Sequence, residues 1–125
     1  MSDLTFSVTA LDRTDYMAKE VLRAIAFYRD VLGLEPLDGS GEKGAEFELP
    51  DGAVFGLWIG GAEQPFQPGN GVMFGVDDFP AAVASLKARG IPILSEFETP
   101  VCFIATFNDS EGNVVNIYKR KDLGP

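Results

Sequence analysis

Five carboxylates in strand or turn positions are the first candidates for chemistry in this sequence. Glu46 and Glu48 could hold a hard cation, but they alternate with apolar residues, as the outward face of a strand does. Asp51, Asp109 and Glu111 stand in turn sequences, where such side chains bond to nearby backbone. The chain has no histidine, the commonest metal ligand and the usual general base near neutral pH. We therefore do not expect an intrinsic metal site.

The other candidates are a lone cysteine, a lone tryptophan and two tyrosines. Cys102 stands in an apolar run without a neighbouring cation to lower its pKa, so we expect a buried hydrophobic residue. Nucleophilic catalysis of the Ser–His or Cys–His kind is excluded by the missing histidine. Tyr28 and Tyr118 are expected to pack. Trp58 could be core or a stacking wall for a planar ligand, because glycines nearby leave room beside it.

Composition limits the classes of partner and compartment. The net charge of −9 argues against nucleic acid, which requires a stripe of Lys and Arg. No apolar run approaches the ~20 residues that span a bilayer, and the first residues do not read as a secretory signal. A single cysteine cannot form an internal disulfide. We expect a cytoplasmic protein without nucleic-acid or membrane partners.

The elements that must position these side chains are arranged as a repeat. RAIAFYRDVLGLEPL (23–37) and AAVASLKARGIPIL (81–94) each predict a helix, a stop at Gly33 or Gly90, and a short strand. Thr14 and Asp15 are cap candidates for the first helix, which is expected from Tyr16. The second helix is expected from residue 77. Strands are predicted at 4–11, 34–37, 45–49, 53–59, 72–76, 91–94 (near an edge, because of a proline), 101–107 and 114–118.

Four segments together resemble a known family: IAFYRDVLGLEPL, FELPDG, VMFGVDDFPAAVASLKARGIPIL and FNDSEGNVVNIYK. They resemble the vicinal oxygen chelate superfamily, which contains glyoxalase I, extradiol dioxygenases, fosfomycin-resistance enzymes and bleomycin-resistance proteins. The resemblance implies an α+β fold in which two βαβββ modules form a cupped, curved mixed sheet, commonly completed by dimerisation. Residues 1–125 are then one domain, with modules at 1–60 and 71–120, a linker at 61–70 and a tail at 121–125.

The resemblance also locates the metal ligands of the family's enzymes, one on each of four strands. They fall on Gly71, on Asn116, near Asp3 or Thr5, and at Val54 or Gly56. Glycine has no donor, and a neutral amide is a poor ligand. The chain therefore resembles the metal-free members, and no cofactor is expected.

The expected function is to bind a small hydrophobic or aromatic compound in the cupped cavity, in the manner of antibiotic sequestration. The acidic total charge weakly favours a cationic ligand. The residues expected to line the cavity are Trp58, Met73, Asn116 and Tyr118, with hydroxyls from Thr5 and Ser7. No catalytic residue is expected. The alternatives are a glyoxalase-like lyase or isomerase that uses Glu46, Glu48 or a tyrosine, and a non-catalytic dimerisation domain. A homodimer is expected.

Overall fold

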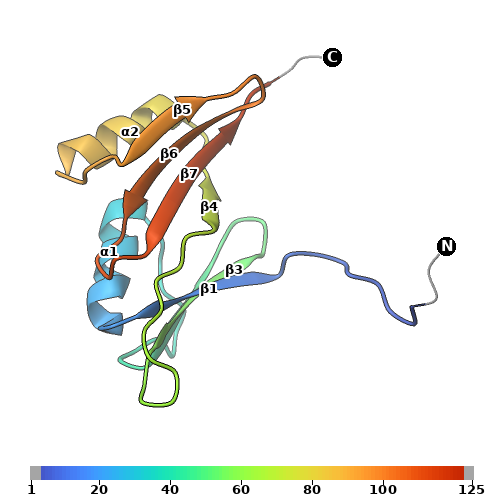
Figure 1. Ribbon diagram of the computed structural model, residues 1–125, viewed down its shortest axis with the longest axis vertical. Helices are drawn as coiled ribbons and strands as arrows, with labels where there is room; N and C mark the ends of the chain where they lie inside the picture. Colours follow the sequence, from blue (N-terminus) through green and yellow to red (C-terminus); the bar gives the residue numbers. More distant parts are fainter. Residues whose placement is uncertain (1–3, 123–125) are drawn as a thin grey trace.

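The computed structural model describes residues 4–122, which form two sheets with two helices on one side of them (Figure 1). In the first sheet the strand order is β1-β3-β2, and in the second it is β4-β7-β6-β5. This α+β architecture is the fold class that the sequence predicts. The elements are β1 (Arg13–Ala18), α1 (Val21–Leu32), β2 (Gly44–Glu48), β3 (Val54–Ile59), β4 (Val72–Gly75), α2 (Phe79–Ala88), β5 (Ser95–Glu98), β6 (Cys102–Asn108) and β7 (Val114–Arg120).

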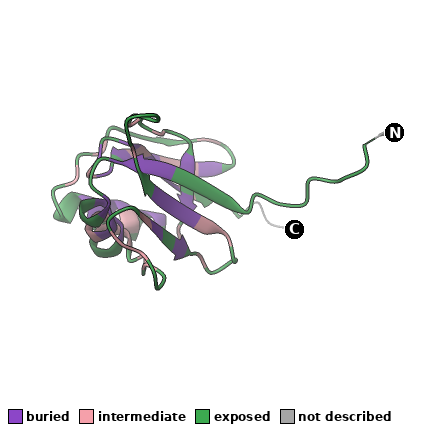
Figure 2. Cartoon of the chain, turned by 90° about the horizontal axis from the view of Figure 1, so that it is seen from below, coloured by how far each residue is buried: buried purple, intermediate pink, exposed green. Residues whose placement is uncertain are grey.

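The first strand is not where the sequence analysis predicts it. Residues 4–11 are exposed and have no regular structure, and the strand is β1, paired in parallel with β3 (Figures 1 and 2). The helix expected from Tyr16 begins at Val21 instead. The physical reason is that Tyr16 is needed in a strand: its hydroxyl accepts from Val72 N (2.9 Å) and donates to Val114 O (2.6 Å), so it fixes β1 against the second module.

Two other predicted strands are changed. The segment 34–37 is reduced to an isolated bridge between Pro36 and Phe47, because a proline has no N–H to donate to a ladder. The strand predicted at 91–94 lies later, as β5, although β5 does occupy the edge of its sheet. The first module therefore contributes three strands and the second four.

Both helices end as predicted, at glycines in the left-handed region. Gly33 has φ 71° and Gly90 has φ 75°, conformations that cost glycine little. At the other end of α2, Asp78 is the N-cap, and its carboxylate accepts from Ala81 N at 3.0 Å. The largest departure is the start of α1, and α2, expected from residue 77, begins two residues later at Phe79.

The core is a single apolar cluster that runs through both modules (Figure 2). Tyr28 of α1 stands at its centre, with ring centroids 4.8 Å from Phe55, 6.1 Å from Phe47 and 6.3 Å from Phe74. Burying each such ring contributes about 1.5–3 kcal/mol. Since these aromatic residues come from β2, β3 and β4, α1 holds the two sheets together.

The β6–β7 hairpin adds a network of buried hydrogen bonds between the modules. Asp109 accepts from the Tyr28 hydroxyl at 2.6 Å, and Asn113 Nδ2 donates to Met17 O at 2.9 Å. Glu111 accepts from the backbone N–H groups of residues 19 and 20 and from the Arg23 guanidinium. Glu111 thus holds the two residues just before α1, whose N-cap, Glu20, makes no side-chain capping bond of its own. The predicted cap candidates Thr14 and Asp15 lie within β1.

A glycine in the connection between the modules is required by close packing. A Cβ on Gly69 would lie 2.3 Å from the Tyr16 ring. The ring cannot swing aside, because its hydroxyl is held by two backbone groups. Residues 61–70, predicted as a linker, contain no helix or strand, but this part of the chain is packed tightly at one point.

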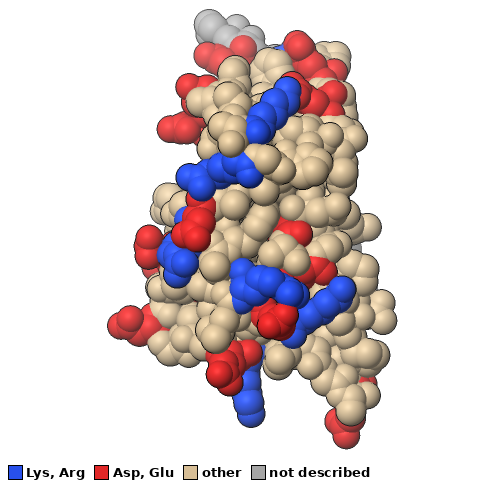
Figure 3. All heavy atoms as spheres, turned by 90° about the vertical axis from the view of Figure 1, so that its left-hand side faces the viewer, with Lys and Arg blue, Asp and Glu red and all other residues tan. Residues whose placement is uncertain are grey.

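The surface on the helix side carries mixed charge. Lys and Arg side chains are interspersed there with Asp and Glu, without a broad basic area on this face (Figure 3). Within residues 4–122, neither helix has the length and apolar composition needed to cross a membrane.

Candidate ligand-binding site

The face of the first sheet opposite the helices carries an ion cluster across its strands. The strand register places Asp15, Gly56 and Glu46 in one row, on β1, β3 and β2. The Arg13 guanidinium spans this row: it donates to both carboxylate oxygens of Asp15 (2.6 and 2.9 Å) and to Glu46 Oε2 (2.7 Å). Each of its three nitrogens therefore donates one hydrogen bond to these acids.

Gly56 is what allows the cluster to lie flat on the sheet. A Cβ at this position would be 1.9 Å from Asp15 Oδ1 and 2.6 Å from Arg13 Nη2. Any other residue would lift the ion pair off the strand. Gly56 therefore cannot ligate a metal, but its missing side chain leaves the space that the Arg13–Asp15 salt bridge occupies.

Trp58 lies in the next row of the same face, between Met17 on β1 and Gly44 on β2. Its side chain is 37% exposed, and the glycine beside it leaves the ring uncovered. The ring lines a pocket of about 630 Å³, within the range of small-molecule sites. The pocket lining is Arg13, Asp15, Asp38, Gly39, Ser40, Lys43, Gly44, Ala45, Glu46, Leu57 and Trp58.

The charges around this pocket are mixed and slightly acidic. Three carboxylates line it, from Asp15, Asp38 and Glu46, against the two cations Arg13 and Lys43. The hydrogen bond from Arg13 to Asp15 raises the pKa of the guanidinium most, and the bond to Glu46 raises it further, so Arg13 stays charged. The site thus offers a flat aromatic surface beside a charged rim with one excess negative charge.

The structure does not bring the other predicted ligand residues to this pocket. Met73 lines a separate cavity of about 380 Å³ with Gly71, and Arg13 is shared between the two. Tyr118, on β7, is half-buried and paired with Gly75 and Ile104. The predicted single hollow is thus two adjoining open pockets within the described chain.

Three further predicted positions lie at the N-terminus or in the interior. Thr5 and Ser7 are exposed in the irregular segment before β1 and line neither pocket. Asp3 lies outside the described residues. Asn116 is buried, where its amide oxygen accepts from Thr106 Oγ1 (2.7 Å) and its amide nitrogen donates to Val72 O (3.0 Å). Its polar atoms therefore tie β7 to β4 and β6.

The donor set at the family's metal positions does not fit a divalent ion. Gly71 and Gly56 offer no side chain, and both polar atoms of Asn116 are engaged. No group of three or more His, Cys, Asp or Glu side chains that could hold a metal occurs within the part of the chain described. The carboxylates of Asp15 and Glu46, on the same face of the sheet, both form ion pairs with the Arg13 guanidinium, which takes the place that a cation would have between them.

The tyrosines and the cysteine are held in structural contacts. Burial raises the pKa of Tyr28, and the Asp109 carboxylate raises it further. Burial also raises the pKa of Tyr16. Both phenols therefore stay protonated near neutral pH and cannot serve as bases. Cys102 is buried as expected, with Sγ 3.2 Å from Thr99 Oγ1.

Sequence analysis missed Arg13 and Asp15 because it placed the first strand too early. A signal was present, since Arg13, Asp15 and Met17 alternate with Thr14 and Tyr16 in the period of a strand. The apolar alternation of residues 4–11 offered a more obvious strand. The same shift explains why the first-strand metal position was sought near Asp3 or Thr5.

Comparisons with known proteins agree with the fold. The model of the Glyoxalase/Bleomycin resistance protein/Dioxygenase superfamily matches residues 10–117. Lactoylglutathione lyase from Agrobacterium tumefaciens is similar in structure, with TM-score 0.76 and 23% identity over 90% of this chain and 95% of that one. TnmS3, an antibiotic binding protein from Streptomyces sp. CB03234, gives TM-score 0.72 and 24% identity over 93% and 99%.

A glyoxalase family protein from Bacillus anthracis gives TM-score 0.78 and 20% identity, over 94% of this chain and all of that one. No curated protein matches the sequence. At these identities the solved structures establish the fold alone, whereas the family model covers most of the chain. The chain belongs to the Glyoxalase/Bleomycin resistance protein/Dioxygenase superfamily.

Proposed function

We propose that this protein binds a planar aromatic compound against Trp58 and sequesters it, without a metal ion held by its own side chains. The observation that carries the proposal is the exposed Trp58 ring, which lies between a glycine and an ion cluster in a pocket of suitable size. Flat rings stack on such a surface with little dependence on their substituents. The excess negative charge of the rim favours a cationic ligand.

Binding is favoured over catalysis by the state of the polar groups. Arg13 is committed to Asp15 and Glu46, and Tyr16 and Tyr28 are committed to internal acceptors. An antibiotic binding protein and a lyase both share the fold, so fold likeness alone does not separate the two roles. The two roles can be separated by an assay for lactoylglutathione lyase activity with added Ni²⁺, Zn²⁺, Mn²⁺ or Fe²⁺. Turnover that depends on a stoichiometric metal would overturn the proposal.

Replacing Trp58 with alanine is expected to weaken binding of a planar cationic dye by about 5- to 150-fold, the equivalent of the 1–3 kcal/mol that one stacked ring contributes. Isothermal titration calorimetry measures this without relying on Trp58 fluorescence. Because the ring is partly exposed, the free energy of unfolding should fall by less than the roughly 3–5 kcal/mol that removing a fully buried aromatic ring costs. Trp58→Phe is the matched control and should retain most of the affinity.

The same experiment can contradict the proposal. Unchanged affinity together with a loss of several kcal/mol in stability would make Trp58 a core residue. Addition of EDTA should leave the melting temperature and the dye affinity unchanged. A clear fall in either would show that a bound ion supports the site.

The proposal includes a homodimer. Before β1 the chain exposes the apolar side chains of Phe6, Val8 and Leu11, at 65%, 86% and 93%, and the second sheet exposes Met73 and Phe97. An extended segment that exposes several large apolar side chains, as residues 6–11 do, is typical of an interface. Changing Phe6, Val8 and Leu11 to serine should convert a dimer to a monomer in sedimentation equilibrium. A monomeric parent protein, or a dimer unaffected by the changes, would refute this arrangement.

A further inference from the structure

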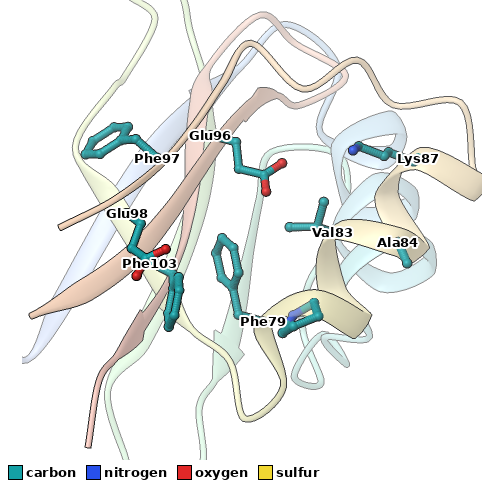
Figure 4. A pocket seen from close by; sticks show the side chains of 9 residues that line it. Phe79, Val83, Ala84, Lys87, Glu96, Phe97, Glu98 and Phe103 are labelled. Carbon is teal, nitrogen blue, oxygen red and sulfur yellow. The ribbon is translucent and has the colours of Figure 1, made fainter. Parts of the chain in front are cut away.

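A second groove lies on the helix side of the molecule, away from Trp58, between α2 and the edge strand β5 (Figure 4). Its volume is about 550 Å³, close to that of the Trp58 pocket. It is lined by Phe79, Pro80, Val83, Ala84, Lys87, Glu96, Phe97, Glu98 and Phe103. None of these residues belongs to the site described above.

The floor of this groove is aromatic. Phe79 and Phe103 stack with centroids 5.5 Å apart and ring planes at 27°. Val83 adds an apolar wall from α2, and in Figure 4 its side chain points toward the two rings. A flat or branched apolar group placed here would contact carbon atoms on two sides.

The rim of the groove carries opposite charges on opposite walls. Glu96 projects from β5 and Lys87 from α2, and Figure 4 shows the two charged ends directed into the space between these elements. Neither forms an ion pair with any residue of the described chain. Glu98, by contrast, is paired with Lys121, which itself lies 5.0 Å from the Phe103 ring centroid. The free charges are therefore one carboxylate and one ammonium.

The alternation of β5 produces this arrangement. Glu96 and Glu98 face the helix layer, and the Phe97 ring lies on the opposite side of the strand (Figure 4). Charged side chains that point inward on an edge strand also discourage pairing with other chains. That role accounts for the two glutamates, but it requires neither a facing lysine nor an aromatic floor.

We propose that this groove binds a small zwitterion with an aromatic group, of the chemical class of the aromatic α-amino acids. The ammonium group pairs with Glu96, the carboxylate pairs with Lys87, and the ring rests on Phe79 and Phe103. The inference does not depend on the function proposed for the Trp58 pocket. It names a different ligand class at a different place.

The test compares three probes by calorimetry: L-phenylalanine, phenethylamine, which lacks the carboxylate, and 3-phenylpropionate, which lacks the ammonium. Glu96→Gln should weaken L-phenylalanine and phenethylamine about 5-fold and leave 3-phenylpropionate unchanged or tighter. Lys87→Gln should weaken L-phenylalanine and 3-phenylpropionate and spare phenethylamine. Glu48→Gln is a matched control that removes a negative charge elsewhere. Trp58→Ala should leave the affinities for L-phenylalanine and 3-phenylpropionate unchanged, which separates this site from the first pocket; phenethylamine is left out of this comparison because an aromatic cation also fits the Trp58 pocket.

Several outcomes would overturn the inference. They are no saturable binding of L-phenylalanine, an equal effect of both variants on all three probes, or loss of L-phenylalanine binding in Trp58→Ala. A double-mutant cycle on the free energy of unfolding adds an independent readout. A measurable coupling between Lys87 and Glu96 in the free protein would mean that they pair with each other rather than with a ligand.

Discussion

Replacing Asp109 with alanine is expected to lower the free energy of unfolding by about 3–5 kcal/mol. One carboxylate satisfies the Tyr28 hydroxyl, Asn113 Nδ2 and the backbone N–H groups of Glu111 and Asn113, at 2.6–2.9 Å. Without it these donors are left inside the protein, and each unsatisfied buried group costs about 1–3 kcal/mol. Urea denaturation followed by circular dichroism measures the loss.

Asp51→Ala is the matched control for this change. Asp51 is also a turn aspartate, but it is exposed and accepts a single hydrogen bond, from Ala53 N at 3.0 Å. Its removal should cost less than about 1 kcal/mol. If the two substitutions had similar effects, the hairpin would be an ordinary turn and not a connection between the modules. Tyr28→Phe should fall between them, because it removes one of the four donors and leaves the carboxylate in place.

These two aspartates also show how far the sequence could predict the fold. It assigns both to turns, and both do accept turn N–H groups. It could not predict that Asp109 reaches Tyr28, 81 positions away, because local patterns carry no information on which turn meets which helix. Likewise the glycine stops of both helices were predicted correctly, since a helix end depends on neighbouring residues alone.

The first strand was predicted wrongly for a related reason. Residues 4–11 have the alternation of a strand, but a strand forms only where another strand is available to pair with it. The edge of β3 pairs with β1 instead, and residues 4–11 pair with no strand of the described chain. In the sequence, the polar residues 12–15 predict a loop and the spacing from Tyr16 predicts a helix. Because Arg13 and Asp15 were misplaced, the sequence analysis could name Trp58 but not the ion cluster beside it.

The glutamate of the same hairpin should make the stability of this protein fall in acid. Burial alone would raise the pKa of Glu111, but the hydrogen bonds from Arg23, Glu20 N, Ser110 and Lys19 N outweigh it and lower the pKa to about 2. A depressed pKa in the folded state stabilises the fold above the ordinary value, here 4.5, and the contribution is lost as the pH falls toward 2. The shift corresponds to about 3 kcal/mol.

Glu111→Gln should therefore lower the free energy of unfolding by about 3 kcal/mol at pH 6, and the difference from the parent protein should shrink steadily below pH 4.5. Urea titrations at pH 6, 4 and 3 measure it. Glu20→Gln controls for the charge, because Glu20 is the exposed partner of the same Arg23, and exposed pairs contribute less than about 1 kcal/mol. A difference that stayed constant with pH would mean that the Glu111 side chain stabilises the hairpin by its shape and not by its charge.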